Sequence, residues 1–233
     1  MADRNSTTAD IGRAQSLFRA RAAGRLLLAC LAALLTGPPV SADFLPSIVR
    51  QPQRGIFLVA NKSLADPNFA QTVVLLTYHG VKGSIGLIVN KSTTVDVIST
   101  LPELKDLADP EAKMRFGGPL ELFSVRLLVS SPDEIQNAQR LFNDVYFVNS
   151  TATLRSLLEK GEPNAPSTVN YYAGYAGWSS GQLPTEIARG DWYLIEADAA
   201  TIFERDSATV WRELVEKLEG TWVLIENTLS AGG

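Results

Sequence analysis

The sequence predicts an α+β fold, in which strands and helices are mixed within a single domain. Short apolar runs of strand length recur along the chain, helical spacing of apolar residues is confined to a few segments, and the order of the two is irregular. A regular strand–helix alternation would instead indicate a doubly wound parallel sheet. With 233 residues and 45% hydrophobic content, the chain can bury a core without a disulfide or a structural metal.

The domain is predicted to begin with three strands. Residues 55–60 and 72–78 are apolar runs rich in branched side chains, and residues 84–90 form a third such run. Residues 79–83, His-Gly-Val-Lys-Gly, are typical of a turn. Because only this short segment separates the second and third strands, we expect them to pair antiparallel as a hairpin.

The next part of the chain is punctuated by proline and glycine. Residues 93–101 and 104–108 indicate a weak helix that is interrupted by one proline and followed by another. Gly117-Gly118-Pro119 is predicted to be a turn, and it lacks the Gly-Lys-Ser/Thr continuation of a phosphate-binding loop.

Four strands and three helices complete the prediction. In chain order they are strand 124–130, strand 146–148, helix 151–160, strand 169–175, helix 184–189, strand 192–196 and helix 207–218. Ser150 or Thr151 is the expected cap of the first of these helices, and Gly161 is its expected end. Gly190 ends the second helix. The third has apolar residues at helical spacing and is therefore amphipathic.

Residues 1–42 are predicted to be a signal peptide. A polar start is followed by three arginines within 19–25 and by the apolar run 26–35. This run is too short to span a bilayer, which takes about 20 apolar residues, and Gly-Pro-Pro follows soon after it. The last residues of the segment, Val-Ser-Ala, place small side chains where signal peptidase requires them, so we expect cleavage between Ala42 and Asp43.

Three other interpretations of this segment stay open. Cys30 would carry the lipid of a lipoprotein, although the apolar run continues beyond it. Translation would start downstream only at a non-standard codon, because no Met lies between Met1 and Met114. The segment would otherwise be a flexible cytoplasmic tail. The signal-peptide interpretation predicts a periplasmic or secreted protein without a stable membrane anchor, with a linker at 43–50, one domain at 51–226 and a tail at 227–233.

Composition and charge exclude several kinds of site. One His and one Cys in the whole chain rule out zinc sites built on several His and Cys ligands, and they rule out disulfides within the chain. We expect no metal and no cofactor. The net charge is −4, and removal of residues 1–42 takes away five Arg and two Asp, which brings it to −7. An acidic domain without a basic run is not expected to bind nucleic acid.

The segment 172–183 is the densest motif, with three glycines and three aromatic residues among its twelve residues and a Ser-Ser-Gly-Gln-Leu end. This combination is typical of a pocket lining or of tight packing between a strand and a helix. Residues 177–181 also match the Gly-x-Ser-x-Gly nucleophile elbow, which makes Ser179 a candidate nucleophile. Hydrolases with that elbow place their histidine after the serine, whereas the single histidine, His79, precedes it. A lone His in a turn is more often structural than catalytic.

Several motifs, spread in order over nearly all of the chain after residue 42, resemble the YqgE/AlgH family of bacterial proteins. They are Leu58-Val59-Ala60, Leu64-Ala65-Asp66-Pro67-Asn68-Phe69, Thr72-Val73-Val74-Leu75-Leu76, Gly86-Leu87-Ile88-Val89-Asn90, Gly117-Gly118-Pro119, Gly174-Tyr175-Ala176-Gly177-Trp178 and Gly181-Gln182-Leu183. The resemblance implies one α+β domain with a mixed, strongly curled, partly barrel-like sheet flanked by helices. It implies no established reaction, although some members are named transcriptional regulators. Tyr78 replaces the acidic residue that the family usually has before its histidine, and family members are generally cytoplasmic without a leader.

The leading expectation is a non-catalytic, exported domain that binds a small ligand or a protein partner. The binding groove is expected to include Gly117, Gly118, Pro119, Gly174, Tyr175, Gly177, Trp178, Gly181 and Gln182. One alternative is a hydrolase that uses Ser179 or His79. A second is a cytoplasmic transcriptional regulator, which requires that the leader is not real.

Overall fold

The first predicted strands are present in the structure, a computed structural model that describes residues 46–159 and 168–231. β1 (Ile56–Ala60), β2 (Val73–Gly80) and β3 (Gly83–Ile88) pair antiparallel in this order, so the predicted hairpin is confirmed. The predicted turn was too long. His79 and Gly80 still belong to β2, and the last pair of the hairpin joins Gly80 to Gly83. The predicted signal peptide lies outside the described residues, as does the predicted helix end at Gly161.

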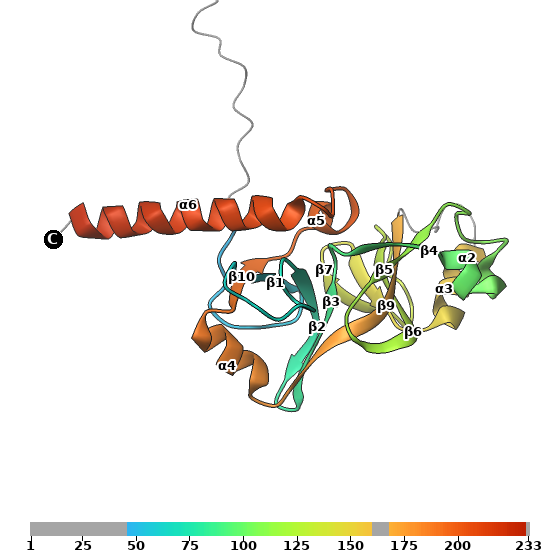
Figure 1. The fold of residues 1–233 in the computed structure, drawn as a ribbon. Helices are drawn as coiled ribbons and strands as arrows, with labels where there is room; N and C mark the ends of the chain where they lie inside the picture. The colour runs from blue at the N-terminus through green and yellow to red at the C-terminus, as the bar shows by residue number, and fades with distance from the viewer. Residues whose placement is uncertain (1–45, 160–167, 232–233) are drawn as a thin grey trace, which may run out of the picture. The chain divides into compact units, whose positions relative to one another are not determined.

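The sheet is mixed and has 10 strands (Figure 1). The remaining strands are β4 (Ser92–Asp96), β5 (Lys113–Phe116), β6 (Leu120–Ser130), β7 (Gln139–Phe142), β8 (Val145–Val148), β9 (Thr168–Ser179) and β10 (Trp192–Glu196). Their order is β10-β1-β2-β3-β9-β6-β8-β7, and β5 joins β4 to β9. β5 runs parallel to β9, and the other pairings between these strands are antiparallel.

The helices predicted late in the chain are confirmed, with changed bounds. They are α3 (Thr151–Glu159), α4 (Gln182–Arg189) and α6 (Val210–Ala231), and a short α5 (Ala199–Phe203) was missed. Ser150 caps α3, because its hydroxyl accepts a hydrogen bond from the Thr153 N–H at 3.3 Å. Gly190 ends α4 in the left-handed conformation, as predicted. In the described part of the chain, no helix has the length and apolar character that crossing a membrane takes.

The weak helix predicted at 93–101 was wrong over its first half. Residues Ser92–Asp96 form β4, whose backbone pairs with β5, and only the turn α2 (Val97–Thr100) and the 3-10 turn η1 (Pro102–Leu104) are helical. The partner strand β5 lies about 20 residues away in sequence, so the local pattern carried no sign of it.

Contacts between the far end of the sheet and its middle show that the sheet is strongly curled. The side-chain amide of Gln139 in β7 donates to the Thr77 carbonyl of β2 at 3.4 Å, although four strands separate β7 from β2 in the sheet order. Gly55, just before β1, packs on the Leu141 carbonyl of β7. β7 therefore returns toward β2, which confirms the predicted partly barrel-like arrangement.

Two helices cover opposite faces of the strands at one end of the sheet (Figure 1). Phe57 and Val59 of β1 share a buried cluster with apolar residues of α6, whereas Ile56 and Leu58 share another with Leu183 of α4. Side chains alternate between faces along a strand, so both faces of β1 are buried. A third cluster lies between α2, η1 and strands β5, β6, β8 and β9.

Tyr172 of β9 is the largest fully buried side chain, and its hydroxyl has no hydrogen-bond partner among the described residues. Burial raises the pKa of Tyr172 to about 12, while the charge of Arg115 and the side chain of Asn170 act in the opposite direction. The hydroxyl therefore stays protonated at neutral pH and lies beside a guanidinium and an amide.

Candidate functional site

The Gly117-Gly118-Pro119 turn joins β5 to β6 and lies directly against β9. Gly118 has φ +150°, and a Cβ at this position would lie 2.2 Å from the Tyr175 carbonyl carbon. A Cβ on Gly174 would likewise lie 2.3 Å from the Gly118 carbonyl oxygen. The two glycine motifs that the sequence pairs in one groove are therefore in backbone contact, which only glycine permits at these positions.

The structure places Gly117 and Gly118 against Gly174 and Tyr175, but much of the predicted groove set is packed into the interior. Gly117, Gly118, Gly174 and Trp178 are buried. Pro119, Tyr175 and Gly177 are partly buried, and Gly181 and Gln182 are exposed at the start of α4. A ligand would reach only the edge of this set.

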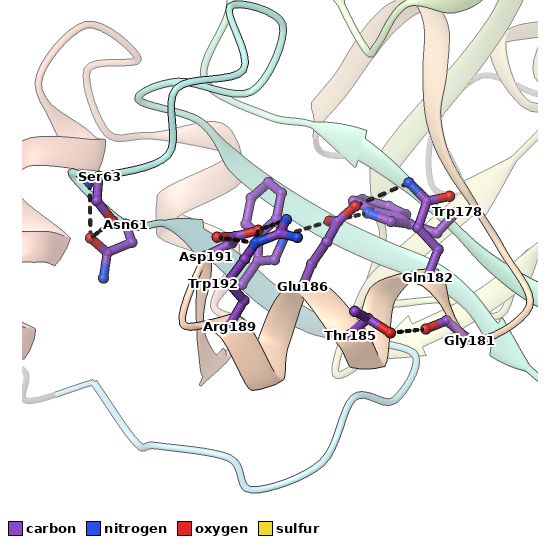
Figure 2. A network of polar contacts seen from close by, with 10 residues as sticks. All are labelled: Asn61, Ser63, Trp178, Gly181, Gln182, Thr185, Glu186, Arg189, Asp191 and Trp192. Carbon is purple, nitrogen blue, oxygen red and sulfur yellow. Dashed lines mark hydrogen bonds and ion pairs between the residues drawn. The ribbon is translucent and has the colours of Figure 1, made fainter.

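Trp178 belongs to an aromatic cluster with Phe69 and Trp192. The ring of Phe69 stacks on Trp178 with centroids 5.8 Å apart, and Trp192 meets both rings edge to face. One carboxylate oxygen of Glu186 accepts hydrogen bonds from both indole N–H groups, at 2.8 Å from Trp178 and 2.9 Å from Trp192 (Figure 2). Glu186 therefore fixes α4 against β9 and β10.

The network continues along α4 on either side of Glu186 (Figure 2). Gln182 donates to the second Glu186 oxygen at 3.0 Å, and its own oxygen accepts from the N–H of Ser179 at 3.1 Å and from its hydroxyl at 3.2 Å. Arg189 forms an ion pair with Asp191. Hydrogen bonding to Asp191 raises the pKa of Arg189, so the guanidinium stays charged. Gln182 and Ser179 are therefore parts of a structural hydrogen-bond network.

Ser179 and His79 do not form a nucleophile–base pair in this structure. The register pairs His79 with Ser84, and Ser84 with Trp178, so these three side chains share one face of the sheet. Ser179 follows Trp178 and is directed to the other face, and β3 separates it from His79. His79 Nδ1 instead lies 2.8 Å from the Ser84 hydroxyl. The acceptor at Ser179 is the neutral amide of Gln182, which is no general base.

An exposed apolar patch lies next to the turn, at the start of β6. The exposed fractions of Leu120, Leu122 and Phe123 are 43%, 49% and 103%. Glu121 has φ +48°, and the register of β6 against β9 shifts between Leu120 and Val125, so the strand bulges here. We call Leu120, Leu122 and Phe123 the β6 patch.

Charged and aromatic side chains border the β6 patch. Arg126 lies over the ring of Tyr175, 4.2 Å from its centroid, and donates to the Glu121 carboxylate at 3.1 Å. Leu120 also contacts β9, where a Cβ on Gly177 would lie 2.8 Å from its Cδ1 atom. The patch is thus held at the outer edge of the predicted groove.

Sequence reasoning missed Glu186 and the β6 patch. Glu186 is a single acidic residue in a short helix, and nothing in its local pattern indicates two indole donors. The run from Leu120 to Phe123 did carry a signal, because Leu-Glu-Leu-Phe breaks strict alternation and leaves two adjacent large apolar residues. Across residues 46–159 and 168–231, no group of three or more His, Cys, Asp or Glu residues is arranged to hold a metal ion.

Comparison with known proteins gives consistent relatives. A sequence profile described as AlgH-like (DUF179) matches residues 57–223. A UPF0301 protein of Chlorobaculum parvum is 31% identical over 174 residues, which are 75% of this chain and 91% of the relative. UPF0301 protein SCO2948 of Streptomyces coelicolor is 34% identical over 173 residues, which are 73% of this chain and 89% of the relative.

Solved structures share the fold. The crystal structure of protein DIP2367 from Corynebacterium diphtheriae has a TM-score of 0.62 at 27% identity, over 71% of this chain and 86% of that protein. The solution structure of the AlgH protein from Pseudomonas aeruginosa has a TM-score of 0.58 at 28% identity, over 73% of this chain and 92% of that protein. The matched profile runs from β1 into α6, and the chain belongs to the AlgH-like family.

Proposed function

We propose that this chain is a non-catalytic regulatory domain that binds a protein partner through the β6 patch. The observation that carries the proposal is the full exposure of Phe123, a large aromatic side chain. Its neighbours along β6 are less exposed, since Leu122 is half-exposed and Ser124 is partly buried. Exposed apolar groups that form a contiguous patch commonly mark interaction sites, and aromatic residues are common anchors of interfaces.

Two further observations support a protein partner. The Glu121–Arg126 ion pair next to the patch supplies the polar rim that is typical of protein interfaces. The separation of Ser179 from His79 by β3 favours binding over serine hydrolysis. The occupant is proposed to be a protein whose own surface offers an apolar cleft for Phe123.

Phe123→Ser is expected to weaken partner binding by about tenfold or more, as loss of a central aromatic anchor does. The melting temperature is expected to change by no more than about 2 °C, because Phe123 has no burial to lose. The protein can be made in its own cells with a photo-cross-linking residue at position 123. Irradiation of these cells is expected to give one discrete adduct, whose partner mass spectrometry identifies.

Val81 provides the matched control, because it is apolar and 91% exposed but stands alone in the β2–β3 turn. A cross-linker at position 81 is expected to give no such adduct, and Leu122→Ser is expected to reduce the adduct formed from position 123. The same adducts from both positions would contradict the proposal. An adduct of the chain with itself would make the partner a second copy.

Export is proposed as well, on the order of polar, basic, apolar and small residues in the first 42 positions. The full chain expressed in a bacterium is expected to yield a periplasmic product whose first residue is Asp43. Ala42→Arg, which places a large charged group before the cleaved bond, is expected to block that processing. An uncleaved cytoplasmic product of the unchanged chain would overturn export and restore the cytoplasmic regulator interpretation.

A further inference from the structure

A cavity of about 600 Å³ lies away from the β6 patch, where β4, β5 and the start of β9 meet the loop after η1. Its lining combines aliphatic side chains of that loop and of β9, Leu107, Ala108 and Val169, with the polar side chains of Lys113, Arg115 and Asn170. This volume falls within the range of small-molecule sites, about 300–1,000 Å³. The mixture of surfaces suits a ligand with one polar end and one apolar end.

The cations in the lining differ in how far they are already neutralised. Lys113 forms an ion pair with Asp96, and hydrogen bonding to that carboxylate raises the pKa of Lys113. Arg115 is partly buried, and its one hydrogen bond among the described residues is a long one, from Nη1 to the Val89 carbonyl at 3.4 Å. Most of the donors of the Arg115 guanidinium therefore lack an acceptor in the described part of the chain.

The one carboxylate in the lining is already engaged and exposed. Asp109 accepts a hydrogen bond from the Glu111 N–H at 2.9 Å, so it closes its own loop turn. Lys113 is paired with Asp96 and the lining also contains the carboxylate of Asp109, so Arg115 is the one cation of the lining without an ion pair among the described residues. That balance favours a monoanion over a phosphate dianion.

Tyr172 does not line the cavity, but its buried hydroxyl lies beside the side chain of Asn170, which does. Tyr172 pairs with Arg115 across β5 and β9, and it lies within the influence of Arg115 and Asn170, which both line the cavity. The side-chain amide nitrogen of Asn170 donates to the Ile202 carbonyl at 2.9 Å, which leaves the Asn170 side-chain oxygen as an acceptor. That oxygen can accept from the Tyr172 hydroxyl, so Asn170 is engaged with the core and Arg115 is left as the source of free donors in the cavity.

We propose that this cavity binds a small monocarboxylate with an apolar body. The carboxylate accepts two N–H bonds from Arg115, the geometry in which guanidinium groups recognise carboxylates. The apolar body lies against Leu107, Ala108 and Val169. The cavity and the β6 patch have no residue in common, so a result against this proposal would not count against the proposed protein interface.

The test uses benzoate as the probe and the full chain as the protein. Calorimetric titration is expected to show saturable binding in the millimolar range, and the backbone amide signals of Arg115 and Asn170 are expected to shift in NMR spectra. Benzyl alcohol, which has the same ring without the charge, and inorganic phosphate are each expected to bind at least about tenfold more weakly. Benzoate that fails to saturate the protein at tens of millimolar would overturn the proposal.

Arg115→Gln is expected to weaken benzoate binding about tenfold or more, and Arg115→Lys is expected to be nearly as weak because it keeps the charge but loses the paired donors. Arg140→Gln is the matched control, since this exposed arginine of β7 is paired with Asp144 and does not line the cavity. Equal losses in the two glutamine variants would overturn the site.

Discussion

Gly118→Ala is expected to unfold the protein or to destabilise it by about 4 kcal/mol or more. The new Cβ would lie 2.2 Å from the Tyr175 carbonyl carbon, and the nearest atoms it would meet all belong to the backbone of β9, so no side chain can move aside. The φ of +150° adds a conformation that an L-residue rarely adopts. Urea unfolding followed by far-UV circular dichroism measures the loss.

Gly181 is the matched control for this substitution. It also has positive φ, +77°, but a Cβ there would meet no atom within 4 Å. Gly181→Ala is therefore expected to cost only the backbone strain, about 1 kcal/mol. Similar losses at the two positions would show that the turn can move away from β9, and the close backbone contact would then not be required for folding.

Glu186→Ala is expected to lower the free energy of unfolding by about 3 kcal/mol. The substitution leaves the indole N–H groups of Trp178 and Trp192 without their acceptor, and each unpartnered buried donor costs about 1–3 kcal/mol. For a domain of this size the melting temperature is expected to fall by about 6–12 °C. Near-UV circular dichroism should also change, because both indoles lose their fixed contact.

Glu186→Gln should lose much less, about 1 kcal/mol, because the amide oxygen can still accept from the indoles. Glu204→Ala removes an exposed carboxylate after α5 and is expected to change stability by no more than about 0.5 kcal/mol. If Glu186→Ala proved as mild as Glu204→Ala, the two indoles would have to find other acceptors, and the network would not hold α4 in place.

The strands that the sequence predicted well are those whose pattern reflects burial on both faces. All five residues of β1 are buried, and the apolar run that predicted this strand contains them. β10 was predicted with its observed bounds. A run of large apolar residues follows Gly190 and Asp191, and charged residues end that run. Such apolar runs indicate directly that each residue in them is buried.

The strands that the sequence missed are short and are defined by their partners. β4 is mostly exposed and pairs only with β5, while β7 has four residues at the end of the sheet order. Their own side chains bury too little surface to leave a pattern. Their formation depends on backbone hydrogen bonds to strands distant in sequence, and those bonds leave no trace in composition.

The candidate site divides in the same way. The sequence by itself determined the family and the α+β class, because these depend on residue type and order, whereas the groove between the Gly117-Gly118-Pro119 turn and the segment around Gly174 was only a prediction. Only the tertiary structure decided that the two meet through buried backbone contact, that Phe123 is exposed beside them, and that Arg115 and Asn170 line one cavity. The physical reason is that strand register and sheet curl bring together residues about 55 positions apart, and they decide which side chains meet solvent.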